Sequence, residues 1–193
     1  YWTREVFVFK TEPIMVFDPF EEGWSYRKKI TIDHDLVDDD LSDFPVLVSV
    51  VDDDLSFKAQ VDGDDILFMD GPGVANRLLH EIEQYENSNG KLVAWVKVSE
   101  LDRDVDSVFY LYYGNPLCDS QQYPKQVWDE NYLMVQHMNS NYDFANDSTS
   151  HDNDGIISGA TETNGIIGQA LHFDGESFIE FSPVIRFEND FSV

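Results

Sequence analysis

Short runs of alternating apolar and polar residues recur along the first two thirds of the chain. Clear examples are Lys91–Val98 (KLVAWVKV) and Ser107–Gly114 (SVFYLYYG), and further runs lie at 26–33, 44–51, 65–70 and 78–85. This period of two predicts β-strands with one buried face. Groups of Gly, Pro, Asn and Asp, such as Asp70-Gly71-Pro72-Gly73, separate the runs and are typical of tight turns. We therefore expect an all-β fold, namely an antiparallel β-sandwich of jelly-roll type.

The texture of the sequence changes near residue 117. Residues 117–131 are polar, contain Pro124 and hold the best helical candidate, at 125–131. We expect a linker over 117–131, a first β-sandwich over 24–116 and a partial second sandwich over 132–193. The second sandwich would use strands at 132–138, 155–159, 169–174, 177–181 and 190–193. Residues 1–23 are expected to add an edge strand or to exchange with another copy.

The charge excludes several classes of partner. The 193 residues carry 38 acidic and 12 basic side chains, for a formal net charge of -26. Such a surface repels phosphate backbones and anionic lipids, so we expect no nucleic-acid partner. No apolar run approaches the roughly 18 residues of a spanning helix, so no membrane insertion is expected. The one cysteine, Cys118, cannot form an intramolecular disulfide.

The first half resembles a known family. The ordered motifs WSYRKKITID from Trp24, DGDDILFMD from Asp62, HEIEQY from His80 and FYLYYGN from Phe109 are similar to the domain-of-unknown-function family numbered 2341, over about 24–115. That family occurs in large bacterial and archaeal surface proteins and has no established reaction. The resemblance implies an extracellular or cell-surface location and no particular chemistry.

The second half is similar to the start of a different fold family. The stretches NDSTSHDNDGIISGA and IGQALHFDGESFIEF, within 132–193, resemble the front of a concanavalin A-like or laminin-G-like lectin domain. This resemblance implies a second, truncated β-sandwich, and it raises the prospect of carbohydrate binding and of a structural calcium ion.

One segment resembles a catalytic strand. Residues 81–86 (EIEQYE) are similar to the E-I-D-x-x-E strand of laminarinase-type glycoside hydrolases, with Glu83 in place of the family's Asp. A retaining mechanism needs two carboxyls about 5 Å apart. On a regular strand Glu81, Glu83 and Tyr85 share one face and Glu86 points away, so Glu81 and Glu86 converge only through a β-bulge. The alternative is an outward-facing acidic strand, and we expect no enzyme.

Calcium is the expected cofactor if the chain binds one. Hard oxygen donors gather in turns at Asp62 and Asp64, and again at Asp147, Asp152 and Asp154. Carboxylate oxygens are the ligands that Ca²⁺ prefers, but neither group has the spacing of an EF-hand. The alternative is a set of solvated loops with local side-chain turns.

Aromatic side chains offer a sugar-binding surface. Trp24, Trp95, Tyr110 and Tyr112 are the candidates, because sugar rings stack on exposed Trp and Tyr faces. The competing interpretation is that these rings are core residues. Together the patterns favour a non-catalytic adhesion or assembly module of a surface or filament protein. Its partners would be other copies, surface proteins or a polysaccharide; a carbohydrate-binding module is the alternative, and a glycoside hydrolase is less favoured.

Overall fold

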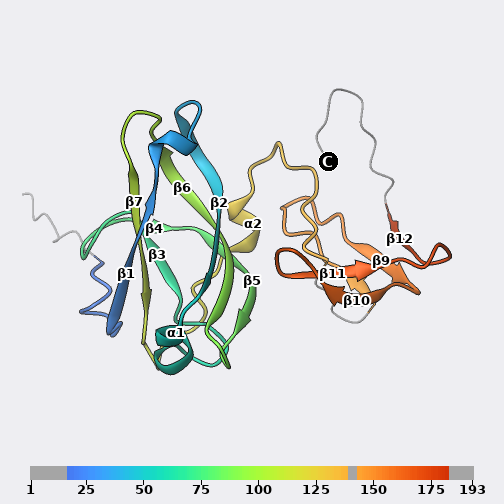
Figure 1. Ribbon diagram of the computed structural model, residues 1–193, viewed down its shortest axis with the longest axis horizontal. Helices are drawn as coiled ribbons and strands as arrows, with labels where there is room; N and C mark the ends of the chain where they lie inside the picture. The colour runs from blue at the N-terminus through green and yellow to red at the C-terminus, as the bar shows by residue number, and fades with distance from the viewer. Residues whose placement is uncertain (1–16, 139–142, 183–193) are drawn as a thin grey trace, which may run out of the picture.

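The structure is a computed structural model that describes residues 17–138 and 143–182 (Figure 1). Most of the N-terminal segment 1–23 and the expected strand at 190–193 fall outside these described residues. The expectation that residues 1–23 form an edge or exchanged strand therefore stays a prediction.

Two antiparallel sheets form a sandwich in the first half of the chain. The first sheet has the order β1-β7-β3-β4 and the second has the order β2-β6-β5. Their bounds are β1 Tyr26–Ile32, β2 Leu41–Val51, β3 Leu67–Met69, β4 Arg77–Leu78, β5 His80–Glu86, β6 Lys91–Leu101 and β7 Ser107–Tyr113. The expected all-β class and the antiparallel sandwich are thus confirmed.

The alternation along β6 and β7 builds the core. Leu92, Ala94, Val96 and Val98 face inward from β6, and Phe109, Leu111 and Tyr113 face inward from β7. Each of these side chains is buried, and each large one contributes roughly 1.5–3 kcal/mol by leaving water. The opposite faces of these two strands remain available for other contacts.

A second apolar cluster covers the outer face of the first sheet. Trp24, Leu67, Met69 and Tyr112 are buried there, and Phe17 packs against them. The indole Nε1–H of Trp24 donates a hydrogen bond to the Asp65 carbonyl oxygen at 2.7 Å. This cluster anchors the chain just before β1 to the back of the sandwich.

Two short helical turns lie in loops of the sandwich. The 3-10 helix η1, His34–Leu36, follows β1, and α1, Asp53–Lys58, follows β2. The Asp52 side chain caps α1 by accepting a hydrogen bond from Asp54 N, and Leu55 packs into the core. Asp53 and Asp54 occupy its first turn and Lys58 its last turn, the charge order that the helix dipole favours.

The segment 117–131 packs on the sandwich rather than running free. Its helix α2, Pro124–Val127, begins with a proline in the first turn, where the missing N–H costs nothing. Val127 and Trp128 are buried, and Tyr123 N donates to the His80 carbonyl oxygen at 2.9 Å. The segment expected to be a linker therefore covers part of β5.

The last part of the chain forms a smaller β unit beside the sandwich (Figure 1). One sheet has the order β12-β9-β8 and a second pairs β10 with β11. The bounds are β8 Phe144–Ala145, β9 Gly155–Ser158, β10 Thr161–Asn164, β11 Gln169–His172 and β12 Phe178–Phe181. The expected strand at 132–138 is wrong, because this stretch makes a single bridge, between Gln136 and Asp147.

Among the described residues, no helix is both long and apolar enough to cross a membrane.

Candidate functional site

A β-bulge in β5 sets the direction of two glutamate side chains. The register of β5 on β6 shifts between Ile82 and Gln84. After the shift Tyr85 turns to the core, with its hydroxyl donating to the Leu55 carbonyl oxygen at 2.9 Å. Glu81 and Glu83 remain together on the outer face of this sheet. Tyr85 would share the face of Glu81 and Glu83 on a regular strand, and the bulge turns it to the core instead.

His137 bridges the two glutamates. Its Nε2 lies 3.1 Å from Glu81 Oε2, and its Nδ1 lies 3.2 Å from Glu83 Oε2. The side chains of the three residues are 5–9% exposed, so the ion pairs are shielded from water and salt. We call Glu81, Glu83 and His137 the charge triad.

Two tryptophans and a serine complete the surroundings of the triad. Trp95 Nε1 donates to Glu83 Oε2 at 2.8 Å, and Trp128 Nε1 donates to Glu81 Oε2 at 2.9 Å. The Ser148 hydroxyl donates to the other oxygen of Glu81. The Trp95 and Trp128 rings contact each other at 5.2 Å between centroids, and the Trp95 ring stacks on His137 at 6.1 Å.

The C-terminal unit closes the site on its remaining side. Gly168, at φ +58°, sits so close to Glu83 that an added Cβ would overlap Glu83 Oε1. A side chain at this contact would have to displace the Glu83 carboxylate, and glycine also adopts this φ at little cost. The loop between β10 and β11 thereby covers the carboxylate.

The triad carries a protonated histidine at neutral pH. Burial alone would lower the pKa of His137, but its contacts with Glu81 and Glu83 outweigh burial and raise that pKa to about 9. For Glu83, burial raises the pKa, while the contacts with His137 and Trp95 lower it more, so that the net pKa is below its usual value. Two carboxylates and one imidazolium leave the site with a net negative charge.

The carboxylates of the charge triad differ from those of a glycosidase, because other side chains of the protein already engage them. Both oxygens of Glu81 and the Oε2 of Glu83 already have partners, and His137 stands between the two carboxylates. Glu86 does not converge on Glu81, because its carboxylate accepts hydrogen bonds from Gln84 and Asn89 near the β5–β6 turn. A substrate would have to displace His137 and the tryptophans to reach either acid.

The expected sugar-binding aromatics do not form one platform. Trp24 and Tyr112 are buried, so neither has a free ring face, which corrects the expectation for these two residues. Trp95 belongs to the surroundings of the charge triad. Tyr110 is half-buried on the other sheet, with the Arg27 guanidinium over its ring at 5.1 Å.

The expected metal residues in the second half organise a loop. Asp147 Oδ1 accepts from Val135 N and Thr149 N, and its Oδ2 accepts from Asn153 N and the Thr149 hydroxyl. Burial raises the pKa of Asp147, but these hydrogen bonds lower it more. Asp154 accepts from Asp147 N, and Asp152 pairs with Lys125. The carboxylate of Asp147 therefore has no vacant position directed at an ion.

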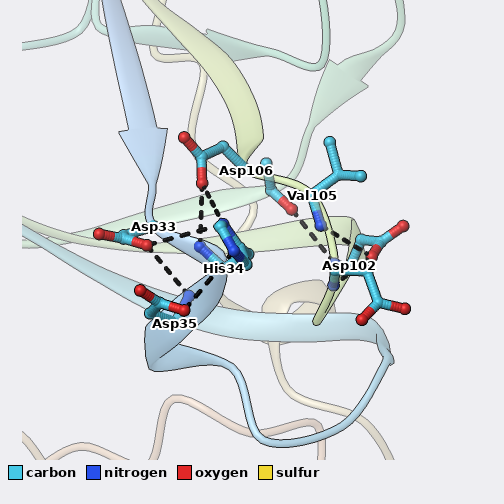
Figure 2. A network of polar contacts seen from close by, with 8 residues as sticks. Asp33, His34, Asp35, Asp102, Val105 and Asp106 are labelled. Carbon is cyan, nitrogen blue, oxygen red and sulfur yellow. Dashed lines mark hydrogen bonds and ion pairs between the residues drawn. The ribbon is translucent and has the colours of Figure 1, made fainter.

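In the first half, the exposed Asp62 accepts from the N–H of the half-buried Asp64, a local turn contact. A group not expected from the sequence places ligand-type atoms close together at Asp33, His34 and Asp35 (Figure 2). There the backbone N–H of His34 donates to Asp106, and its ring Nδ1 lies 2.7 Å from the same carboxylate. This exposed group is satisfied by its own ion pairs. Calcium stays a prediction, which a thermal-shift titration with the ion tests.

The fold defines an all-β protein built on an antiparallel sandwich. A family model described as "Domain of unknown function (DUF2341)" matches residues 62–153, slightly less than half of the chain. The match starts later and ends further along than the expected span 24–115. It contains every member of the charge triad together with Trp95, Trp128 and Ser148. Neither the curated proteins nor the solved structures contain a significant match, and the lectin-like second module stays a prediction.

Proposed function

We propose that this chain is a non-catalytic module of an extracellular or cell-surface protein, with a role in adhesion or assembly. The observation that carries the proposal is the state of the paired carboxylates. The best-placed acids, Glu81 and Glu83, are enclosed and serve to join β5 to the segment that contains His137 and Ser148.

A sheet face with three large apolar side chains, which the described residues leave half exposed, supports the assembly role. Phe144, Ile156 and Phe178 lie on one face of the β12-β9-β8 sheet, and each is 52–54% exposed. Ala145 and Ile157 on the opposite face are buried, so the sheet already has its own core side. Large apolar side chains gathered on a surface mark protein contact sites more often than chance. A second copy or another surface protein is the proposed partner.

The edges of the first sandwich do not favour random strand addition. β1, at one edge, carries Lys28 and Lys29, and β2 carries Pro45 and the positive φ of Asp43. Charged residues and proline on edge strands are the usual protection against edge-to-edge pairing. Assembly through the exposed face of the smaller unit is therefore the better proposal than strand exchange by the sandwich.

The test compares two exposed apolar positions. Ile156→Asp places a charge in the centre of the proposed contact face, and Leu117→Asp changes a side chain that is 93% exposed elsewhere. Sedimentation velocity over a range of concentrations should show self-association of the wild type and of Leu117→Asp, and its loss in Ile156→Asp. Monomers at every concentration, together with no retention by any surface protein, would contradict the proposal.

A carbohydrate-binding module is the second candidate, and one hollow supports it. A cavity of about 270 Å³ beside α1 is lined by Tyr26, Phe57 and Gln60, and Phe57 is 83% exposed. An exposed aromatic ring beside hydrogen-bonding groups is the usual sugar-stacking arrangement. Retention on a polysaccharide array that is lost in Phe57→Ala would favour this function over assembly. Polysaccharide hydrolysis that is abolished by Glu81→Gln would instead establish an enzyme.

A further inference from the structure

We propose that the charge triad is a latch that responds to pH. In this proposal His137, held between Glu81 and Glu83, keeps the segment after α2 docked on the outer face of the β2-β6-β5 sheet. Loss of the charge on His137 releases that segment while the sandwich stays folded.

The geometry places the latch between two separately built parts. The sandwich has its own core, which includes neither His137 nor Ser148. Trp128, His137 and Ser148 contact Glu81. His137 also contacts Glu83, and Gly168 approaches Glu83 closely. Breaking these contacts would uncover the outer face of β5 and β6 without opening the core between the two sheets.

Charge adds to the apolar contacts of Trp128 in holding this joint. A buried carboxylate without a partner is costly, whereas one paired with a cation and hydrogen-bonded is tolerated. Two glutamates face one histidine, so loss of the imidazolium leaves two neighbouring buried negative charges. A neutral His137 keeps one N–H and can donate to only one glutamate, while the lone pair of its other nitrogen faces the second carboxylate.

The other groups around His137 do not replace its charge. β5 contributes Glu81 and Glu83, and β6 contributes Trp95. β6 also contributes Lys91, whose charge lowers the pKa of Glu83 less than His137 and Trp95 do. The turn after α2 contributes Trp128 and Tyr132. Burial raises the pKa of Tyr132. The loop after β8 contributes Ser148. The neighbouring Asp147 accepts a hydrogen bond from Thr149 N of the same loop. Among the described neighbours, His137 is the cation in direct contact with both glutamates.

The sign and size of the effect follow from the histidine. Its pKa is about 9 when docked, against 6.5 when exposed, so the docked segment is favoured below pH 6.5 and loses this advantage as the pH rises to 9. The difference corresponds to a change of about 300-fold in the docking equilibrium. In acid, Glu83 keeps its charge at a lower pH than an ordinary glutamate does, because its pKa is lowered. The latch therefore stays closed in mildly acid conditions.

Tryptophan emission provides a local signal for opening. Trp95 and Trp128 donate to the glutamates and contact His137, so undocking exposes both indoles and removes a quenching imidazolium. We expect the emission of the full chain to rise and shift to the red between pH 7 and about 9, before most tyrosines, with an ordinary pKa of about 10, ionise. Far-UV circular dichroism should stay constant over the same range.

Two histidine variants separate the latch from general effects. His137→Gln keeps a donor side chain but no charge, and should show open-state emission at neutral pH with no step on titration. His34→Gln is the matched control, because His34 also pairs with carboxylates but is exposed on the loop after β1. It should behave as the wild type.

Chymotrypsin digestion gives the second readout. Cleavage at Tyr132 and Leu133 should accelerate at pH 9.5 and in His137→Gln, by about 60- to 80-fold over the wild type at pH 7 if it tracks the open population, while 26–113 stays intact. The latch is refuted if circular dichroism and emission change together, if emission does not change up to pH 10, or if His137→Gln retains the step. If His137→Gln does not fold, the wild-type titration decides by the same criteria.

Discussion

His80 places an uncharged imidazole inside the sandwich, and this makes the whole fold sensitive to acid. The side chain is fully buried on the inner face of β5, with its ring 5.1 Å from that of Phe68. Burial lowers the pKa of His80 to about 4, although the backbone at Leu78 and Ile66 partly opposes this shift. The unfolded chain, with an ordinary histidine pKa of 6.5, binds the proton more strongly than the folded chain does.

Stability from His80 is therefore complete above pH 6.5 and is lost as the pH falls towards 4. The two pKa values give a loss of about 2 kcal/mol between pH 7 and pH 4.5. We expect urea unfolding to show this decrease in the wild type and in His172→Leu, which changes an exposed histidine.

The comparison variant is His80→Leu, an apolar side chain of similar volume. It should unfold with nearly the same free energy at pH 7 and at pH 4.5. A pH slope in His80→Leu equal to that of the wild type would show that the acid sensitivity arises elsewhere and that the reasoning is wrong.

Two further predictions concern single contacts in the sandwich. Gly90→Ala should lower the free energy of unfolding by more than about 2 kcal/mol, because Gly90 has φ +67° and the added Cβ would overlap the Asp52 carbonyl. Gly175→Ala, at φ +96° with open surroundings, should lose only the backbone part, about 1 kcal/mol, in the same urea assay. Asp65→Ala should cost about 3 kcal/mol, since the buried carboxylate accepts three backbone hydrogen bonds, and Asp64→Ala at the half-buried neighbouring residue should cost much less. Those three donors are Gln60 N, Gly114 N and Asn115 N.

The strands of the first sandwich could be predicted because their residues alternate between two faces. Either one face is exposed and the other buried, or the two faces are buried in different clusters. In 107–114 the alternation correctly separates Phe109, Leu111 and Tyr113 from Tyr110 and Tyr112. Other elements give no such signal. β10 (TETN) has only exposed residues, and α1 is too short for a helical period to appear.

The prediction of a strand over 132–138 was wrong because it rested on the apolar residues of this stretch. Its backbone instead binds the loop after β8: Val135 N donates to Asp147 Oδ1, and Ser148 N donates to the Val135 carbonyl oxygen. A buried side chain that organises a loop cannot be distinguished by composition from a calcium ligand. The sequence marks Asp147 as a candidate calcium ligand, and in the structure its carboxylate accepts from Val135, Thr149 and Asn153.

The candidate site was only half visible in the sequence. Glu81 and Glu83 stood out as a motif, and Trp95 as a tryptophan that could be buried or exposed. His137 did not, because a single histidine in an apolar run has no local feature that identifies its partners 54 and 56 residues earlier. Trp128 and Ser148 share this limit, since long-range pairing is a property of the fold.

One local irregularity links the core to the charge triad. Without the register shift after Ile82, Tyr85 would share the outer face with Glu81 and Glu83, and the core would lose its ring. With the shift, β5 supplies Ile82 and Tyr85 to the core and both acids to the joint. Burying ions in this way gains little stability over apolar contacts of equal volume. Its physical consequence is a docking position fixed by direction and charge, which an apolar patch alone would not specify.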